Sequence, residues 1–188
     1  MLPPADELLV QLLRRIAAQD RNAVAELYDQ VSGPLFAVSF RILGDQHEAE
    51  EVIQDVFVQI WDKAPSFDPV MGAPMSWALS ITRNRSIDRL RSRQRRSRLM
   101  DDLEQVHSID STPALAGSEA TMGDDEVVAI RSAVHSLPLE QRQAIEMAFF
   151  GGKTHLEIAE ALNEPLGTVK ARIRRGMLKL RECLQAYV

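Results

Sequence analysis

The sequence predicts an all-α protein made of two small helical domains. Apolar residues recur at the spacing of helices, and no run of residues alternates as a β-strand would. Between the two helical parts, residues 99–126 are acidic, contain Ser, Thr, Pro and Gly, and show no lasting apolar period. We therefore predict one domain over residues 1–98 and a second over residues 127–188, joined by a flexible acidic linker.

Apolar stripes define the first two helices of the first domain. Residues 6–18 have the pattern of a short amphipathic helix, and a second stripe continues from Val24 to Ile42. Within the second stripe, Ser32-Gly33-Pro34 should kink or split the helix, because proline removes a backbone hydrogen bond and clashes with the preceding turn.

The next two helices of this domain have clear starting signals. Asp45 is a plausible N-cap for the third helix. The apolar face of that helix consists of Ala49, Val52, Ile53, Val56, Phe57 and Ile60. A loop over residues 67–72 follows, and a fourth helix is predicted over residues 74–91, with Trp77, Ala78 and Ile81 inside.

The outer face of the third helix is acidic. This face contains Glu51, Gln54, Asp55, Val58 and Asp62 at i, i+3, i+4, i+7 and i+11. A face exposed to water usually contains lysine as well as glutamate, and this face contains no lysine. We interpret it as a docking surface for a basic helix or hairpin of another protein. The alternative is an acidic face exposed to water, on which the valine is incidental.

The fourth helix leads into a tract of arginines. Residues 83–98 hold eight arginines and one aspartate, a net charge of +7, whereas residues 99–130 hold eight acids and no Lys or Arg, a net charge of −8. Such a tract suits contact with phosphates, Asn84 could read a base edge, and arginine planes could stack on unpaired bases. Alternatively, the arginines pair with the acidic linker. Both interpretations hold if the linker masks the tract in the free protein.

The second domain contains a predicted helix-turn-helix. Thr154 and Glu157 fit a capping box at the start of its first helix, and Asn163, Pro165 and Gly167 mark the turn. Thr168 can cap the second helix. Its predicted inner face consists of Val169, Ile173, Gly176, Met177 and Leu180, and its basic residues are Lys170, Arg172, Arg174 and Arg175. This layout is typical of a helix that enters the major groove of DNA. The alternative is a basic helix exposed to water on a small helical domain.

The composition argues against several classes of protein. The overall charge of −5 conceals the local positive charge, which is what decides binding to nucleic acid. Four scattered histidines, one cysteine and no glycine-rich phosphate loop argue against an enzyme, so we expect no catalytic, metal or cofactor site. We also expect no secretory signal and no membrane insertion, and the lone Cys183 fits a reducing compartment.

Three segments, in this order and around a variable linker, resemble the extracytoplasmic-function group of bacterial sigma factors. HEAEEVIQDVFVQIWDKAPSFDP resembles the core-polymerase-binding helix of that family and the loop after it. SWALSITRNRSIDRLR is similar to the helix that handles the −10 element, and LPLEQRQAIEMAFFGGKTHLEIAEALNEPLGTVKARIRRGMLKL resembles the domain that reads the −35 element. The resemblance covers nearly the whole chain and implies region 2 over residues 1–98 and region 4 over residues 127–188.

The resemblance also implies roles for individual residues. The polymerase clamp would be contacted by Glu51, Gln54, Asp55 and Val58. The melting −10 region would be contacted by Phe67, Arg83, Asn84, Arg85, Asp88 and Arg89, with the loop over residues 67–72 forming a pocket for a flipped base. The −35 duplex would be contacted by Thr168, Lys170, Ala171, Arg172, Arg174 and Arg175.

This chain departs from the pattern of the family at three positions. Ala78 replaces a usual leucine, Ala171 a frequent serine, and His155 a commoner tyrosine or serine. The implied partners are core RNA polymerase, promoter DNA and an anti-sigma factor, and the implied location is the cytoplasm. Two other classes of protein fit the sequence less well. A stand-alone response regulator would need strands in the first domain, and an adaptor without a DNA role would not need the arginine tract.

Overall fold

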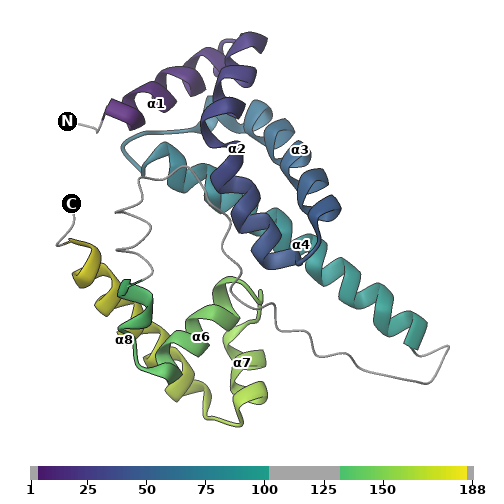
Figure 1. Cartoon of the computed structure of the whole chain (residues 1–188), viewed down its shortest axis with the longest axis vertical. Coiled ribbons are helices and arrows are strands. Elements are labelled where there is room, and N and C mark those ends of the chain that lie inside the picture. The colour runs from purple at the N-terminus through teal and green to yellow at the C-terminus, as the bar shows by residue number, and fades with distance from the viewer. Residues whose placement is uncertain (1–3, 102–131, 186–188) are drawn as a thin grey trace. The chain divides into compact units, whose positions relative to one another are not determined.

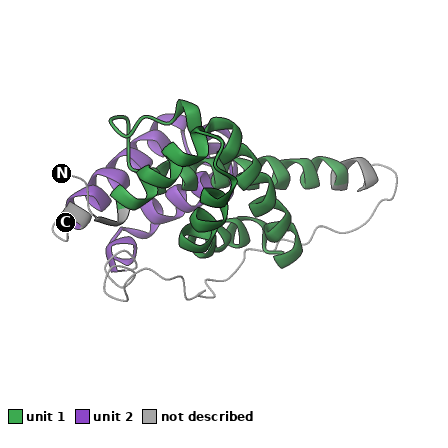
Figure 2. Cartoon of the chain, turned by 90° about the horizontal axis from the view of Figure 1, so that it is seen from above, with its two compact units in different colours: residues 1–120 green, residues 121–188 purple. Residues whose placement is uncertain are grey.

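The computed structural model describes residues 4–101 and 132–185, and the chain divides into two compact units, residues 1–120 and 121–188 (Figures 1 and 2). Within the described ranges every regular element is helical, which confirms the prediction of an all-α protein with two helical domains. None of the helices described is long and apolar enough to cross a membrane. Apart from its first three residues, the predicted acidic linker lies outside the described residues.

Over residues 4–101, unit 1 contains four α-helices and a short 3-10 turn. They are α1 (Pro4–Ala17), α2 (Arg21–Leu43), α3 (Gln46–Lys63), η1 (Ala64–Ser66) and α4 (Pro74–Asp101). The ends of these helices have local causes. The side chain of Asp20 accepts a hydrogen bond from the backbone N–H of Asn22 at 3.0 Å, and Asp45 accepts one from Glu48 at 2.8 Å, as predicted for Asp45. Gly44 ends α2 with φ of 67°, a conformation that glycine adopts without strain.

Of the two outcomes predicted at Ser32-Gly33-Pro34, a kink or a split, the split does not occur. Pro34 lies inside α2, which is described as one helix of 23 residues. An internal proline costs about 3 kcal/mol. However, the apolar stripe on both sides of it is buried, with Leu27 and Val31 before the proline and Leu35 after it. Burying each such side chain contributes about 1.5–3 kcal/mol, so continuing the helix across the proline is favourable.

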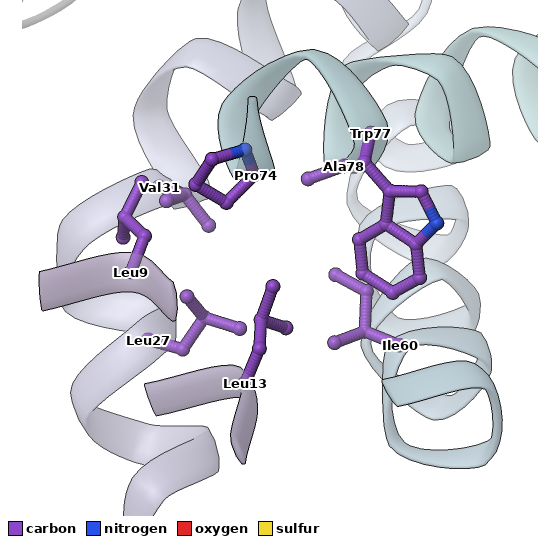
Figure 3. A pocket seen from close by; sticks show the side chains of 8 residues that line it. All are labelled: Leu9, Leu13, Leu27, Val31, Ile60, Pro74, Trp77 and Ala78. Atoms are coloured by element: carbon purple, nitrogen blue, oxygen red, sulfur yellow. The ribbon is translucent and has the colours of Figure 1, made fainter. Parts of the chain in front are cut away.

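The core of unit 1 forms where α1, α2, α3 and the start of α4 meet. The predicted apolar face of α3 is buried in full. Figure 3 shows side chains from all four helices pointing toward one another around a cavity of about 10 Å³. It is lined by Leu9, Leu13, Leu27, Val31, Ile60, Pro74, Trp77 and Ala78. A space of this size holds at most one water, and these side chains offer a water almost no polar partner, so we regard the cavity as part of the core.

The fourth helix is longer than predicted. We expected it to end near Arg91 and the linker to begin at residue 99, but α4 continues to Asp101 and its last part runs past α2 and α3 (Figure 1). The apolar period ends at Leu90, which is why the sequence pattern gave no reason to continue the helix. The residues beyond are mostly Arg, Gln and Ser, and the arginines and glutamine are good helix formers.

Unit 2 contains a short helical stretch over residues 132–135, followed by α6 (Leu139–Phe149), α7 (His155–Leu162) and α8 (Leu166–Gln185). Ile158, Ala159 and Val169 form its buried centre, with Met147, Ala148, Leu162 and Ile173 packed against it. Gly176 lies where α8 presses on α6, because a Cβ there would be 2.6 Å from Cδ1 of Ile145. Met177, predicted on the inner face, is instead exposed, since it lies about 80° around the helix from Val169.

Candidate nucleic-acid interfaces

Three acids of α3 pair with three arginines of α4, and we name this set the α3–α4 ladder. Asp55 accepts hydrogen bonds from Nε and Nη2 of Arg85 at 3.0 and 2.6 Å, and Glu51 lies 2.6 Å from Nη2 of Arg89. Glu48 lies 3.5 Å from Nε of Arg89 and 3.0 Å from Nη1 of Arg93. The structure therefore brings together the residues predicted to dock polymerase and the residues predicted to contact DNA.

The ladder follows from helical spacing on two packed helices. Its acids are at positions 48, 51 and 55 and its arginines at 85, 89 and 93, so each set occupies one face of its helix. Higher numbers on α3 pair with lower numbers on α4, as expected for helices that run in opposite directions. Most of these side chains are 37–48% exposed, so each pair contributes only about 0–1 kcal/mol to folding.

The sequence did not identify all members of the ladder. Glu48 and Arg93 were not among the predicted site residues, although each lies one helical turn beyond a predicted one. Arg93 also donates to the backbone carbonyl of Leu43 at 3.1 Å, which ties α4 to the end of α2. The alternative that the arginines pair with the acidic linker concerns residues outside the described ranges.

The rest of the predicted docking surface points outward. Gln54 is exposed, and Val58 exposes 62% of its surface, a high value for an aliphatic side chain. Glu51 and Asp55 are half-exposed because each has one side against an arginine. The outward part of the α3 face is thus an amide and a valine, flanked by two carboxylates that are already paired.

A second edge of α4, next to the ladder, presents polar residues to solvent. Asn84, Asp88, Arg91 and Arg95 are exposed and follow one another at intervals of three or four residues. Arg83 is half-buried beside them, and its Nη1 lies 3.5 Å from Oδ1 of Asn84. Burial, and to a smaller extent the charge of Arg91, lower the pKa of the Arg83 guanidinium. Two predicted DNA contacts, Asn84 and Asp88, are therefore exposed and are not members of the ladder.

The loop over residues 67–72 exposes a pair of apolar side chains. Phe67 packs against Trp77, with ring centroids 5.2 Å apart. Asp68 shapes the loop, since its side chain accepts from the N–H of Val70 at 2.9 Å and its carbonyl from the N–H of Met71 at 3.0 Å. Val70 and Met71 are 89% and 85% exposed. The sequence analysis missed this pair, although two adjacent apolar residues in a predicted loop were a visible signal.

The helix-turn-helix of unit 2 has the predicted first helix and turn. The N–H of Glu157 donates to Oγ1 of Thr154 at 3.2 Å, and the N–H of Thr154 donates to the Glu157 carboxylate at 2.6 Å. This is the predicted capping box. Asn163 then ends α7 in the left-handed conformation, with φ of 51°.

The prediction that Thr168 caps the second helix was wrong. The helix α8 begins at Leu166, and the carbonyl of Pro165 accepts hydrogen bonds from the N–H groups of Thr168 and Val169 at 2.9 and 3.2 Å. Thr168 is therefore the third residue of the helix. Proline tolerates the position before a helix because it lacks the N–H that would have no partner there.

The basic residues of α8 fall into two groups. Lys170, Arg174 and Arg175 are exposed, and Ala171 beside them is half-buried. The side chain of Arg172, in contrast, is only 16% exposed. Its Nη2 lies 3.0 Å from the Glu140 carboxylate of α6 and 2.9 Å from the Glu164 carboxylate in the turn. The structure thus separates one predicted DNA contact from the others.

The described residues do not meet the requirements of a metal site. No group of three or more His, Cys, Asp or Glu side chains among them is arranged to hold a metal ion.

Two family models match the chain, one in each unit. Residues 27–96 match the model described as Sigma-70 region 2, and residues 128–180 match the model described as Sigma-70, region 4. The first range contains the ladder and the loop, and the second contains the helix-turn-helix.

Solved structures of similar chains include Rhodobacter sphaeroides SigE in complex with the anti-sigma ChrR. That chain is 30% identical, with a TM-score of 0.44, over 93% of this chain and 96% of that one. A second is the sigma factor RpoE in complex with the anti-sigma factor NepR from Bartonella quintana. It is 25% identical, with a TM-score of 0.40, over 86% of this chain and 96% of that one.

Curated relatives match along almost the full length. The ECF RNA polymerase sigma factor SigK of Mycolicibacterium vanbaalenii is 34% identical over 183 residues, which is 97% of this chain and 92% of that protein. SigK of Mycobacterium tuberculosis strain H37Ra is 31% identical over 173 residues, 92% of this chain and 91% of that protein. From these matches and the two family models, the chain belongs to the extracytoplasmic-function family of RNA polymerase sigma factors.

Proposed function

We propose that this chain binds core RNA polymerase and directs it to promoters, with unit 1 holding the opened −10 element and unit 2 reading the −35 duplex. The observation that carries the proposal is that each family region of this chain contains a helix with exposed cationic or amide side chains. We assign residues 1–98 and 127–188 to these two tasks and residues 99–126 to the connection between them.

Unit 2 suits contact with paired DNA. The exposed residues Lys170, Arg174 and Arg175 can meet phosphates or guanine edges, while Thr168 and Ala171 allow the helix to approach closely. Because the major groove admits an α-helix and distinguishes all four base pairs, a single helix is sufficient to read a duplex element.

Unit 1 suits contact with separated bases. Taking a base out of the stack costs a few kcal/mol, and capture of that base by the protein can offset this cost. Asn84, Asp88 and Arg83 offer hydrogen-bonding groups on α4, and the loop beside Phe67 offers the exposed apolar pair Val70 and Met71. The chain would stabilise an open strand without breaking a covalent bond, which is consistent with a protein that is not an enzyme.

We propose that polymerase docks on the outer face of α3. Gln54 and Val58 point outward and would form the direct contact, with Glu51 and Asp55 at its edge. A cation of polymerase that approaches these carboxylates competes with Arg89 and Arg85. Docking would then leave those two arginines available for phosphates. The polymerase-binding surface and the DNA-binding surface would thus be coupled through these ion pairs.

Further partners follow from the family. The solved relatives named above are sigma factors in complex with anti-sigma factors, and we propose that this chain also has a partner of that class. A protein that works on polymerase and promoter DNA would act in the cytoplasm.

In vitro transcription tests the proposal directly. Purified chain and core polymerase would be incubated with a library of promoter fragments, and the transcripts would be sequenced. We expect transcripts from fragments that share a −35 and a −10 element at fixed spacing. Initiation no better than that of core polymerase alone, on every fragment, would contradict the proposal.

A further inference from the structure

We infer that Arg172 is a positioning residue that fixes the recognition helix α8 to the rest of unit 2 and does not contact DNA. The inference rests on the proposed reading of the −35 duplex by α8. It reassigns one of the four basic residues that the sequence pattern grouped together.

The first argument is the geometry of its ion pairs. A single nitrogen, Nη2 of Arg172, lies 3.0 Å from Oε2 of Glu140 and 2.9 Å from Oε1 of Glu164. Glu140 belongs to the first turn of α6, and Glu164 lies in the turn between α7 and α8. One side chain therefore connects the recognition helix to the two segments that determine its position.

The second argument is direction around the helix. Lys170 and Arg174 are each two residues from Arg172, about 200° around the axis at 100° per residue, so they project from the opposite side. Gly176, in contrast, is four residues away and lies on the same face as Arg172. At Gly176 an added Cβ would be 2.6 Å from Ile145 and 3.3 Å from Gln141 of α6. Arg172 therefore lies on the side of α8 that packs on α6.

The third argument is electrostatic. A phosphate that approached Arg172 would also approach the carboxylates of Glu140 and Glu164, and like charges repel. The side chain is also only 16% exposed, so breaking both pairs would be required before it could reach a groove. Lys170, Arg174 and Arg175 are neither buried nor next to a paired carboxylate. All three are exposed, and none of them forms an ion pair with a described acid.

Salt dependence separates a positioning residue from a contact residue. Holoenzyme made from core polymerase and the full chain would be bound to a linear promoter fragment selected from a library, at several salt concentrations. A second fragment would carry a scrambled −35 segment. Losing one phosphate contact lowers the slope of log affinity against log salt by about 1. We expect that decrease for Arg174→Gln and no decrease for Arg172→Gln.

The preference for the selected −35 segment should respond differently. We expect Arg172→Gln to lower the affinity ratio of the two fragments by about fivefold or more, because a displaced helix loses base contacts. Glu164→Gln should lower that ratio in the same direction, although it leaves every cation in place. Its matched control is Glu160→Gln, an exposed acid one turn earlier with no ion pair in the described structure, which should leave the ratio unchanged.

Two results would overturn the inference. One is a slope decrease of about 1 for Arg172→Gln, and the other is tighter promoter binding by Glu164→Gln than by Glu160→Gln. If Arg172→Gln does not fold, Glu140→Gln and Glu164→Gln still decide the question, since both retain the arginine. If Arg174→Gln also leaves the slope and the ratio unchanged, then α8 does not read the duplex, and it is the proposed function that fails.

Discussion

The helices α4 and α8 both carry many arginines but use them differently. On α4, Arg85, Arg89 and Arg93 are paired with the acids of α3. The helix α8 instead exposes most of its cations, and among the described residues it pairs only Arg172 with acids. The acids of the α3–α4 ladder lie beside an outward surface, where a partner could compete for them. The acids that pair with Arg172 lie in the first turn of α6 and in the turn between α7 and α8. The number of arginines therefore does not measure the charge that a helix offers to DNA.

The largest expected effect tests whether the two units are independent. Ile158 is fully buried at the centre of unit 2, so Ile158→Ala should destabilise that unit by about 2–5 kcal/mol through lost burial and a cavity. Hydrogen exchange measured by mass spectrometry should show faster exchange in α6–α8 and unchanged exchange in α2–α4. Leu156→Ala, at a neighbouring position that is 57% exposed, is the matched control and should change little. Faster exchange throughout both units would contradict their independence.

The next largest effect is expected from replacing the exposed arginines of α8. Arg174→Ala or Arg175→Ala should weaken holoenzyme binding to a selected promoter by about 1–3 kcal/mol if a base contact is lost. Arg181→Ala removes an exposed arginine nearer the C-terminal end of the same helix and should have a smaller effect. An unchanged −35 preference in both variants would remove these residues from the interface.

A smaller effect tests the α3–α4 ladder. The double variant Glu51→Gln with Asp55→Asn should change the free energy of unfolding by only about 0–1 kcal/mol per lost pair. It should nevertheless increase the affinity of the free chain for single-stranded DNA and steepen its salt dependence, because Arg85 and Arg89 become available. Asp62→Asn removes another exposed acid of α3 and is the control. Equal gains from the control would show that net charge alone is responsible.

Polymerase binding can be separated from the ladder with one further variant. Gln54 is exposed and uncharged, so its removal leaves the ion pairs of the ladder in place. We therefore expect Gln54→Ala to weaken binding to core polymerase and to leave DNA binding by the free chain unchanged. Affinity measured by fluorescence anisotropy of labelled chain would test this. Full polymerase affinity in this variant and in Val58→Ala would rule out the α3 face as the docking surface.

The smallest effect concerns a second set of ion pairs in unit 1. Arg15 of α1 pairs with Asp20 and Glu26 at 2.7 and 2.8 Å, and hydrogen bonds from Arg15 lower the pKa of both carboxyls. Because their folded pKa values lie below the unfolded ones, the stabilisation is present above the ordinary carboxyl pKa of about 4 and is lost as pH falls through the folded values. Thermal unfolding between neutral and acidic pH should therefore depend less on pH in Arg15→Gln. An unchanged pH dependence would show that these pairs add no stability.

Local signals in the sequence predicted much of the fold. The caps at Asp45 and Thr154 were predicted because an N-cap is a contact between residues two or three apart. The buried face of α3 was predicted because helical periodicity decides which side chains face a core. The split expected at Pro34 does not occur, because burial on both sides of the proline outweighs its local preference. The end of α4 was misplaced because arginine and glutamine favour helix even after the apolar period has ended.

The charged sites were less predictable. Asp55 and Arg85 are thirty residues apart, and their pairing depends on how α3 packs against α4, which no local pattern contains. The ion pair between Arg172 and Glu140 was missed for the same reason, since Glu140 lies on another helix. The sequence analysis identified most of the charged residues of these sites but not which of them bind one another.

The spacing of the α3–α4 ladder restricts how α4 can vary among related chains. One residue added between Arg85 and Arg89 would turn every later side chain by about 100° and advance it by about 1.5 Å, so Arg89 and Arg93 would lose their acids together. Single-residue insertions and deletions should therefore be excluded from this stretch, although arginine-to-lysine changes at one position could persist. Of the described side chains beyond Arg93, those of Arg95 and Arg96 are exposed and take no part in the ladder, so we expect differences in length to accumulate after them.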